Sequence, residues 1–388
     1  MKIVLHIDFN SYFATVEQQA NPRLRGKPIG VTGGDRLKRT VIGAASVEAK
    51  RFGVKTGMQL HEAKILCPEI IFVPGDSDKY LECTKKFINI LKDYSPYLEV
   101  FSIDEVFLEL PSEWGCAVKI AEEVKQRIKQ EIGEWITCSV GISYNKLMAK
   151  LAGSLYKPNG LVIIEDEESA KWVLDRVELD EICGIGSRIK KRLLNTGITN
   201  FSTLRKASKK ALVLEFKSYG EILYNMARGI DHSKVTPFYE REEVKSIGHR
   251  HTISHDTDDL EEIKQILLKL TELVARRLRA KKLVGKTIHL LVRNALSFEG
   301  CEMQTTIQFT QDGLEIFKAA WHLFHSLGIS QKVRMLGVSI SNLQPLIPQT
   351  MSLLEENLKK DTIIKALDKV NDRYGEFTLQ RGILLNSS

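Results

Sequence analysis

The chain has 388 residues, more than one hydrophobic core usually holds, so we expect two to four domains. Its net charge of +7 favours a polyanionic partner, and its hydrophobic content of 43% is ordinary for a globular protein. The six cysteines are scattered without a C-x-x-C pair, which argues against structural zinc and against a disulfide framework. The first apolar run is too short for a signal peptide, and no stretch approaches the roughly 20 apolar residues of a membrane span. We therefore expect a cytoplasmic protein without a membrane partner.

The first part of the chain predicts a series of short elements. An apolar run over 2–7 predicts a buried strand that ends at Asp8, and a helix follows over 9–20. Short strand and helix signals, interspersed with many lysines and arginines, continue to about residue 76. Residues 78–94 then show helical periodicity.

The run 98–110 holds two adjacent carboxylates, Asp104 and Glu105, inside an otherwise apolar and β-branched stretch. Neighbouring side chains on a continuous strand point to opposite faces, so these acids share a target only if the chain bends between them. A buried acid is costly without a positive partner, and a divalent cation would supply one. The alternative is a surface turn, because Asp-Glu also occurs at 166–167 and 180–181.

The next elements complete the N-terminal region. We expect a helix over 117–132, a strand over 137–142, a helix over 146–155, a turn at 157–160 and a strand over 161–164. This order of strand, helix, hairpin, helix and strand favours an antiparallel α+β sheet backed by helices over a doubly wound parallel sheet.

The rest of the chain divides into four parts. Residues 166–231 are predominantly helical, and 233–241 carry few regular signals, which is typical of a linker. Residues 243–343 alternate strand-like runs with long helical patterns, which predicts a second α+β domain. The tail over 346–388 contains a short motif and then one amphipathic helix at 361–374.

Asp8 and the Asp104-Glu105 pair would form a cluster of three carboxylates if their strands are neighbours in one sheet. Such a cluster suits two Mg²⁺ ions, because Mg²⁺ takes oxygen ligands and keeps positions open for water and phosphate. The alternative is that these acids lie on separate strands and are unrelated.

Four motifs, at 8–14, 102–105, 139–146 and 157–160, occur in the order and spacing of the Y-family translesion DNA polymerases. The chain resembles that family over residues 1 to about 345, and most closely its DNA polymerase IV, or DinB-like, group. The resemblance implies a multidomain α+β polymerase of right-hand type with a ferredoxin-like palm, small fingers, a helical helix-hairpin-helix thumb and an α+β little finger. The implied boundaries are 1–18 and 77–165 for the palm, 19–76 for the fingers, 166–232 for the thumb, 233–242 for a linker, 243–345 for the little finger and 346–388 for the tail.

The resemblance also implies a metal site. By resemblance, Asp8, Asp104 and Glu105 are catalytic carboxylates that hold two Mg²⁺ ions, with Mn²⁺ as a substitute. The backbone carbonyl of Phe9 completes the metal shell in the same way.

Two aromatic residues and one lysine match positions that contact the nucleotide in this family. Phe13 matches the steric gate, a ring under the sugar that excludes a ribose 2′-hydroxyl, and Tyr12 matches its supporting neighbour. Without the family, Phe13 would fit equally well as a core residue of a short helix. Lys157 matches the basic residue that holds the triphosphate, and would otherwise be a solvated turn residue.

The fingers match carries two departures from the family pattern. The stretch that begins at Ala44, also a nucleotide-binding position, usually reads Tyr-Glu-Ala-Arg, but here Val47 replaces the tyrosine and Lys50 the arginine. Lysine keeps the charge but loses the bidentate fork of arginine, so we expect Arg51 or Arg39 to share the binding of the triphosphate. Asn10 stands where the family commonly has aspartate, a position that is not the essential ligand.

Gly184 and Gly186 form a Gly-x-Gly turn that opens a basic helix with Arg188 and Lys190. A Rossmann site would need a preceding strand and a third glycine, and neither is present. The pattern instead matches the helix-hairpin-helix of the family's thumb, in which backbone N–H groups hold a DNA phosphate. The alternative is an ordinary helix cap.

The run 276–286 carries six positive charges and no acid. In a domain that matches the little finger, such a helix end would lie along DNA phosphates and bind them without sequence preference. The alternative is a solvated helix face. Residues 246–250 match the start of the same domain, and we expect DNA contacts at Arg276, Arg279, Lys282 and Arg250.

In the tail, Gln349, Leu353 and Leu354 resemble the peptide that bacterial sliding clamps bind, a glutamine followed by two apolar anchors. The alternative is a plain linker. The sequence assigns no role to the helix at 361–374.

The resemblance implies an error-prone, lesion-bypass DNA polymerase that works as a monomer in the bacterial cytoplasm, associated with the nucleoid. Its partners would be primer–template DNA, dNTPs and the sliding clamp. Because of Val47, Lys50 and Asn10, a catalytically silent DNA- and clamp-binding factor is the main rival. A two-metal nuclease or cyclase on the same palm is a third hypothesis, without support from the thumb and little-finger matches.

Overall fold

The computed structural model describes residues 2–33, 39–111, 113–240, 243–296, 300–346 and 355–384. The chain forms two compact units, Met1–Arg241 and Glu242–Ser388. No helix within the described ranges is long and apolar enough to cross a membrane.

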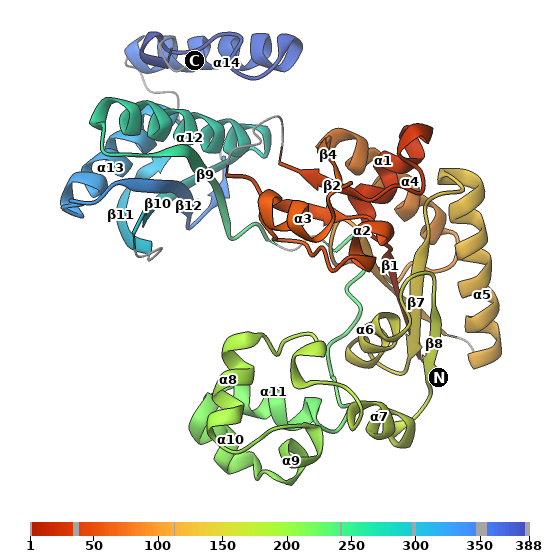
Figure 1. Ribbon diagram of the computed structural model, residues 1–388. Helices are drawn as coiled ribbons and strands as arrows, with labels where there is room; N and C mark the ends of the chain where they lie inside the picture. The colour runs from red at the N-terminus through yellow and green to blue at the C-terminus, as the bar shows by residue number, and fades with distance from the viewer. Residues whose placement is uncertain are drawn as a thin grey trace. The chain divides into compact units, whose positions relative to one another are not determined.

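A five-stranded sheet in the order β5-β6-β1-β7-β8 forms the centre of the first unit (Figure 1). Its central strand β1 lies antiparallel to both β6 and β7, while β8 runs parallel to β7. The predicted α+β class, with a largely antiparallel sheet, is confirmed. The strands are β1 (Ile3–Phe9), β5 (Leu98–Val100), β6 (Glu105–Leu110), β7 (Cys138–Ser143) and β8 (Leu161–Ile164).

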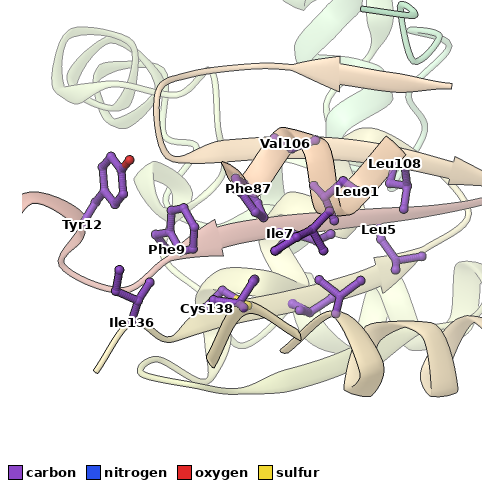
Figure 2. Packing of buried hydrophobic residues seen from close by; sticks show 14 of the residues in the cluster. Leu5, Ile7, Phe9, Tyr12, Phe87, Leu91, Val106, Leu108, Ile136 and Cys138 are labelled. Carbon is purple, nitrogen blue, oxygen red and sulfur yellow. The ribbon is translucent and has the colours of Figure 1, made fainter. Parts of the chain in front are cut away.

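Helices cover both faces of this sheet, so every residue of β1 is buried. On one face, Leu5 and Ile7 pack beside Phe87 and Leu91 of α4, as Figure 2 shows. This double coverage explains why the run 2–7 is continuously apolar rather than alternating. The covering helices are α4 (Ser77–Lys92) and α5 (Trp114–Arg127) on that face and α6 (Lys146–Leu155) on the other.

A smaller three-stranded sheet in the order β3-β2-β4 follows the first helix of the chain. Ile42, Ala49 and Ile70 belong to a core of its own, whereas Ile29 and Val31 of β2 join the core of the larger sheet. This sheet supports a short helix, α2, whose first turn is capped by the Ser46 hydroxyl, which accepts from the N–H of Ala49 at 3.2 Å. The elements are α1 (Tyr12–Ala20), β2 (Ile29–Thr32), β3 (Ile42–Ala45), α2 (Val47–Arg51), α3 (Leu60–Leu66) and β4 (Ile71–Pro74).

The predicted helical region is a cluster of five short helices around a shared core that also includes Leu151 of α6. After it, the segment expected to be a linker has no helix or strand among its described residues, yet it packs on the large sheet. Val235 is buried against Val4 and Phe107, and the N–H of Thr236 donates to the Glu99 carboxylate at 2.8 Å. The helices are α7 (Glu167–Leu174), α8 (Ser187–Asn195), α9 (Phe201–Lys206), α10 (Lys209–Phe216) and α11 (Tyr219–Met226).

The second unit is a four-stranded sheet in the order β11-β10-β12-β9, with two helices packed on one face. Three of these strands were expected from the sequence, but β9 carries so many polar residues that only Ile247 and Ile253 reach the core. The elements are β9 (Ser246–Thr257), α12 (Leu260–Ala280), β10 (Leu283–Asn294), β11 (Gly300–Thr310), α13 (Gly313–Ser326), β12 (Val333–Ser341), β13 (Gln344–Pro345) and the tail helix α14 (Glu355–Tyr374).

Candidate active site

Asp8 and Glu105 lie directly opposite each other on β1 and β6. Side chains of residues paired in this way emerge on the same face of a sheet. Asp104 immediately precedes β6, and its carbonyl accepts from the N–H of Phe9 at 3.0 Å, which holds it next to the end of β1. Of the three predicted acids, Asp8 and Glu105 have ligand atoms within 4.8 Å of each other. The Asp104 carboxylate instead accepts from the Ser102 hydroxyl at 2.5 Å, so a shared target for all three acids stays a prediction.

Two lysines and a histidine contact these carboxylates. Lys157 Nζ lies 2.8 Å from Asp8 Oδ2, and Lys150 Nζ forms an ion pair with Glu105 Oε2. The same Glu105 oxygen lies 3.2 Å from His6 Nε2. Sequence reasoning missed both His6 and Lys150. His6 had a local signal, because a residue two positions before Asp8 on one strand shares its face.

Burial and these contacts shift the proton affinities of the cluster. Burial raises the pKa of Asp8, although the adjacent Lys157 ammonium opposes it. Burial would also raise the pKa of Glu105, but hydrogen bonds from His6 and Lys150 outweigh it and bring the pKa to about 2. Burial lowers the pKa of His6, so its ring is uncharged at neutral pH. Near pH 7 Glu105 is therefore an anion that faces one neutral and one charged donor.

A cavity of about 560 Å³ opens beside the carboxylates, between the large and small sheets of the first unit. Asp8 and Asp104 line it together with Lys157 and, from α2, Lys50. The N-terminus of α1 also faces this cavity. Its N-cap residue, Ser11, has φ 51° and forms no side-chain cap hydrogen bond. Further lining residues are Phe9, Asn10, Tyr12, Phe13, Gly43, Ala44, Ala45, Val47, Arg51, Thr56 and Pro158.

The ring of Phe13 lines this cavity and stacks on that of Tyr80, with centroids 4.3 Å apart. Tyr80, which sequence reasoning did not single out, in turn donates its hydroxyl to Glu17 at 2.8 Å. Tyr12 also lines the cavity, and its hydroxyl is engaged within the fold, where it donates to the Tyr80 carbonyl at 2.6 Å and contacts the Thr84 hydroxyl at 2.8 Å.

Asn10 connects β1 to the turn that carries Lys157. Its Oδ1 accepts from the Thr137 hydroxyl at 3.0 Å and from the N–H of Asn159 at 2.8 Å, while its Nδ2 donates to Ser139 at 2.9 Å. An aspartate could accept the first two hydrogen bonds but could not donate the third.

The fingers residues that depart from the family pattern both line the cavity. Val47 is half-buried there. Burial lowers the pKa of Lys50, and repulsion by the nearby Lys157 ammonium lowers it further. Arg51 lines the same cavity. Lys50 and Arg51 therefore keep positive charge in the cavity although the arginine of the family pattern is missing.

In the helical cluster, Gly184 and Gly186 lie before α8. Gly184 has φ 106°, and a Cβ there would lie 2.7 Å from the Tyr219 hydroxyl, so the turn requires glycine. Gly186 is the N-cap of α8 with open space around it and no side-chain cap. Arg188 is exposed at this end, whereas Lys190 is held by Asp180 at 2.7 Å and by Glu178.

In the second unit, Arg250 lies on the sheet face opposite to α12 and α13. It pairs with Gly337 of β12, where a Cβ would lie 2.8 Å from Arg250 Cγ, so the glycine makes room for the arginine stem. Ser339, Gly248 and His289 line the same shallow hollow.

The basic end of α12 faces the tail helix. Arg279 forms a bidentate pair with Asp368 of α14 at 2.5 and 2.7 Å, and Arg276 lies 2.6 Å from Asp372. The Lys282 carbonyl accepts from the N–H of Leu346 at 2.8 Å, next to β13. The two arginines of α12 that were predicted to contact DNA thus form ion pairs with carboxylates of the tail helix. Gln349, Leu353 and Leu354 lie outside the described residues.

The tail returns to the core of the second unit after α14. The Asn371 side chain exchanges two hydrogen bonds with the backbone of Leu379, and Arg381 pairs with Glu272 of α12 at 2.6 Å. Leu384 is 2% exposed and belongs to the core under α12. The predicted tail helix is present and is an integral part of this unit.

Three family models match the chain. They are described as the impB/mucB/samB family over residues 7–154, the C-terminal domain of that family over 244–353 and a DNA polymerase-iota thumb domain over 180–231.

Relatives named DNA polymerase IV match almost the whole chain. The one from Moorella thermoacetica is 36% identical over 99% of this chain and 96% of the relative, and the one from Pelotomaculum thermopropionicum is 37% identical over 98% and 95%. A solved Y-family DNA polymerase chimera of Dbh and Dpo4 aligns with a TM-score of 0.77 at 26% identity, covering 88% of this chain and 99% of that one.

Proposed function

Because the chain belongs to the Y-family of DNA polymerases, in its DNA polymerase IV (DinB-like) group, we propose that Asp8, Asp104 and Glu105 are its catalytic carboxylates. The protein is a DNA-directed DNA polymerase of the lesion-bypass type, and it binds primer–template DNA and dNTPs. The observation that carries the assignment of the acids is the strand register that places Glu105 opposite Asp8, which lines a basic cavity together with Asp104. In the proposed reaction the primer 3′-hydroxyl attacks the α-phosphate of a dNTP, and pyrophosphate leaves.

Polymerases of this family depend on divalent metal ions. We propose two Mg²⁺ ions, replaceable by Mn²⁺, held by Asp8, Asp104, Glu105 and the carbonyl of Phe9. All four donors are oxygens, which Mg²⁺ prefers, and the ligand atoms of Asp8 and Glu105 lie within 4.8 Å of each other. When bound, such ions would neutralise phosphate charge and lower the pKa of the attacking hydroxyl.

The cavity offers charged groups that suit the triphosphate of a dNTP and an aromatic ring that suits its sugar. The uncapped N-terminus of α1 offers backbone N–H groups and a positive dipole to the triphosphate, and Lys50, Arg51 and Lys157 add charge. Ala44 lines the same cavity. Phe13 offers the face of a ring held rigidly by Tyr80, which supports its role as the sugar gate.

For DNA, we propose contacts from both units. The uncapped Gly186 end of α8, with Gly184 and Arg188, would bind a backbone phosphate, and Lys190 would reach one only by leaving its acidic partners. Arg250, on a sheet face lined by small residues, would contact another phosphate. We assign Arg276 and Arg279 to the docking of the tail rather than to DNA, because each already forms an ion pair with an aspartate of α14.

We further propose that residues 349–354 bind a bacterial sliding clamp, on the strength of the glutamine and leucine pattern alone. A monomer in the bacterial cytoplasm, associated with the nucleoid, fits a polymerase whose partners are DNA and the clamp.

Primer extension with Mg²⁺ tests the catalytic assignment. We expect Asp104→Ala and Glu105→Ala to abolish extension while DNA binding persists. Glu167→Ala, in an exposed Asp-Glu pair of the same composition, is the matched control and should extend like the wild type. Normal extension by either active-site variant would overturn the mechanism, and salt-sensitive DNA binding without any incorporation by the wild type would favour the silent binding factor.

A further inference from the structure

His6 lies at the centre of the carboxylate cluster, and the chemistry described above gives it no task. It is on β1 two residues before Asp8, so both side chains emerge on the same face, and its ring is only 1% exposed. The ring packs against Phe107, with centroids 4.9 Å apart. A buried polar ring beside two acids, Asp8 and Glu105, is expensive unless its nitrogens have partners.

Only one of the two ring nitrogens is paired. Nε2 lies 3.2 Å from Glu105 Oε2, whereas Nδ1 is buried without a hydrogen-bond partner among the described residues. Gly153 of α6 faces Nδ1 so closely that a Cβ on it would lie 2.9 Å away. The ring is therefore wedged between the glutamate and the backbone of α6.

This asymmetry fixes the position of the proton. A neutral imidazole has one N–H donor and one acceptor nitrogen. A proton on Nδ1 would be a buried unpaired donor, and it would leave two lone pairs facing each other at Nε2 and Glu105. A proton on Nε2 removes both penalties and makes His6 a donor to Glu105.

We propose that His6 is a positioning residue, which holds Glu105 Oε2 through Nε2–H and leaves Oε1 directed to a divalent cation. The proposal rests on the metal site of the proposed function. Within the described part of the chain, no hydrogen bond or ion pair reaches Oε1, whereas Oε2 takes both His6 and Lys150.

His6 and Lys150 differ in what a bound cation does to them. The ammonium group of Lys150 is repelled by a cation on the same carboxylate, so this ion pair weakens when the site fills. The His6 ring is held by its packing against Phe107 and against the backbone of α6 at Gly153, so its contact with Glu105 does not depend on that ion pair. His6 is therefore the partner that keeps Glu105 oriented in both the free and the loaded site, and the partner of a metal ligand commonly tunes metal affinity.

Mn²⁺ binding to the full-length protein, followed by electron paramagnetic resonance of free Mn²⁺, tests this role without relying on activity. We expect His6→Leu to weaken Mn²⁺ binding by about 10- to 100-fold. His6→Gln should bind nearly as the wild type, because the glutamine amide nitrogen reaches the position of Nε2. His6→Asn should bind Mn²⁺ as weakly as His6→Leu, because the shorter asparagine amide reaches only the position of Nδ1.

Each outcome separates the two proposals. Weak Mn²⁺ binding by the wild type, or no loss in Glu105→Gln, would contradict the metal site itself. If those controls behave, wild-type affinity in His6→Leu would overturn the role of His6. An equal further loss from His6→Leu in the Glu105→Gln background would also overturn it, because a residue that acts only through Glu105 adds nothing there. If His6→Leu does not fold, the Gln–Asn pair decides the question in the same way.

Discussion

The rings of Phe13 and Tyr80 stack at a centroid distance of 4.3 Å and an interplanar angle of 14°. Tyr80 is itself fixed, because its hydroxyl donates to Glu17, a buried carboxylate that also pairs with Lys79 at 2.8 Å. Phe13, the proposed sugar gate, is thus the outer member of a series of contacts that runs through Tyr80 of α4 to Glu17 and Lys79. Its position depends on residues that never meet the nucleotide.

Phe13→Ala should raise ribonucleotide incorporation relative to deoxyribonucleotide incorporation by about tenfold or more, because the ring that excludes the 2′-hydroxyl is gone. Single-nucleotide kcat/KM values for matched rNTP and dNTP pairs measure this ratio. Unchanged sugar selectivity would refute the gate.

Tyr80→Leu should relax sugar selectivity less than Phe13→Ala, because Phe13 remains but loses the surface that fixes its ring. Tyr80→Phe keeps the stacked ring and loses only the hydroxyl, so it should stay close to the wild type in the same assay. Equal selectivity in Tyr80→Leu and the wild type would show that Phe13 needs no support from Tyr80.

Asn10→Ala removes one buried and two partly buried hydrogen bonds and leaves the N–H of Asn159 without this partner, so we expect a loss of about 2 kcal/mol in the free energy of unfolding. Because Lys157 lies on the same turn, the KM for dNTPs should rise as well. Urea unfolding and steady-state kinetics check the two effects. Asn10→Asp keeps both acceptor contacts and should lose less stability, and an alanine variant as stable as the wild type would contradict this account.

Glu105 should make the metal-free protein more stable as the pH rises from about 2 to 4.5. Its pKa falls from 4.5 to about 2 on folding, so between these values the unfolded state binds more protons. The contribution of Glu105 is complete above this window and is lost as the pH falls through it. Glu105→Gln should flatten this dependence in urea unfolding at several pH values, whereas exposed Glu167→Gln should not. A variant with the slope of the wild type would contradict the depressed pKa.

Arg279→Ala and Arg250→Ala should have opposite profiles. Loss of the Arg279–Asp368 pair should lower the melting temperature and leave the salt dependence of DNA binding unchanged. Loss of Arg250, on the open sheet face, should reduce the salt slope by about one and leave the melting temperature unchanged. The reverse pattern would return Arg279 to the DNA interface.

The sequence was informative where local pattern and chemistry coincide. The apolar run before Asp8 predicts a buried strand, and the hairpin around Asp104 and Glu105 follows from the requirement that two adjacent acids share one target. The family motifs then add Phe13 and Lys157. The Gly-x-Gly turn at 184–186 likewise predicts the start of α8 at Ser187.

Contacts between distant segments were not predictable in this way. Tyr80 reaches Phe13 from α4, and Lys150 reaches Glu105 from α6, with sequence separations of 67 and 45 residues that no local period reports. The basic run on α12 looks like a phosphate-binding face until Asp368 and Asp372, about 90 residues later, are placed on it. The linker looks unstructured because only a few of its residues dock it, among them buried Val235 and Pro237 and the hydrogen bond from Thr236 to Glu99.

The docking of the tail changes what a clamp would encounter. On one side of residues 347–354, β13 is hydrogen-bonded to β10, and on the other side α14 is held to α12. The described elements on either side of the proposed clamp-binding residues therefore belong to one folded unit. A clamp that bound there would not have to order these flanking elements, as it would for a free terminus.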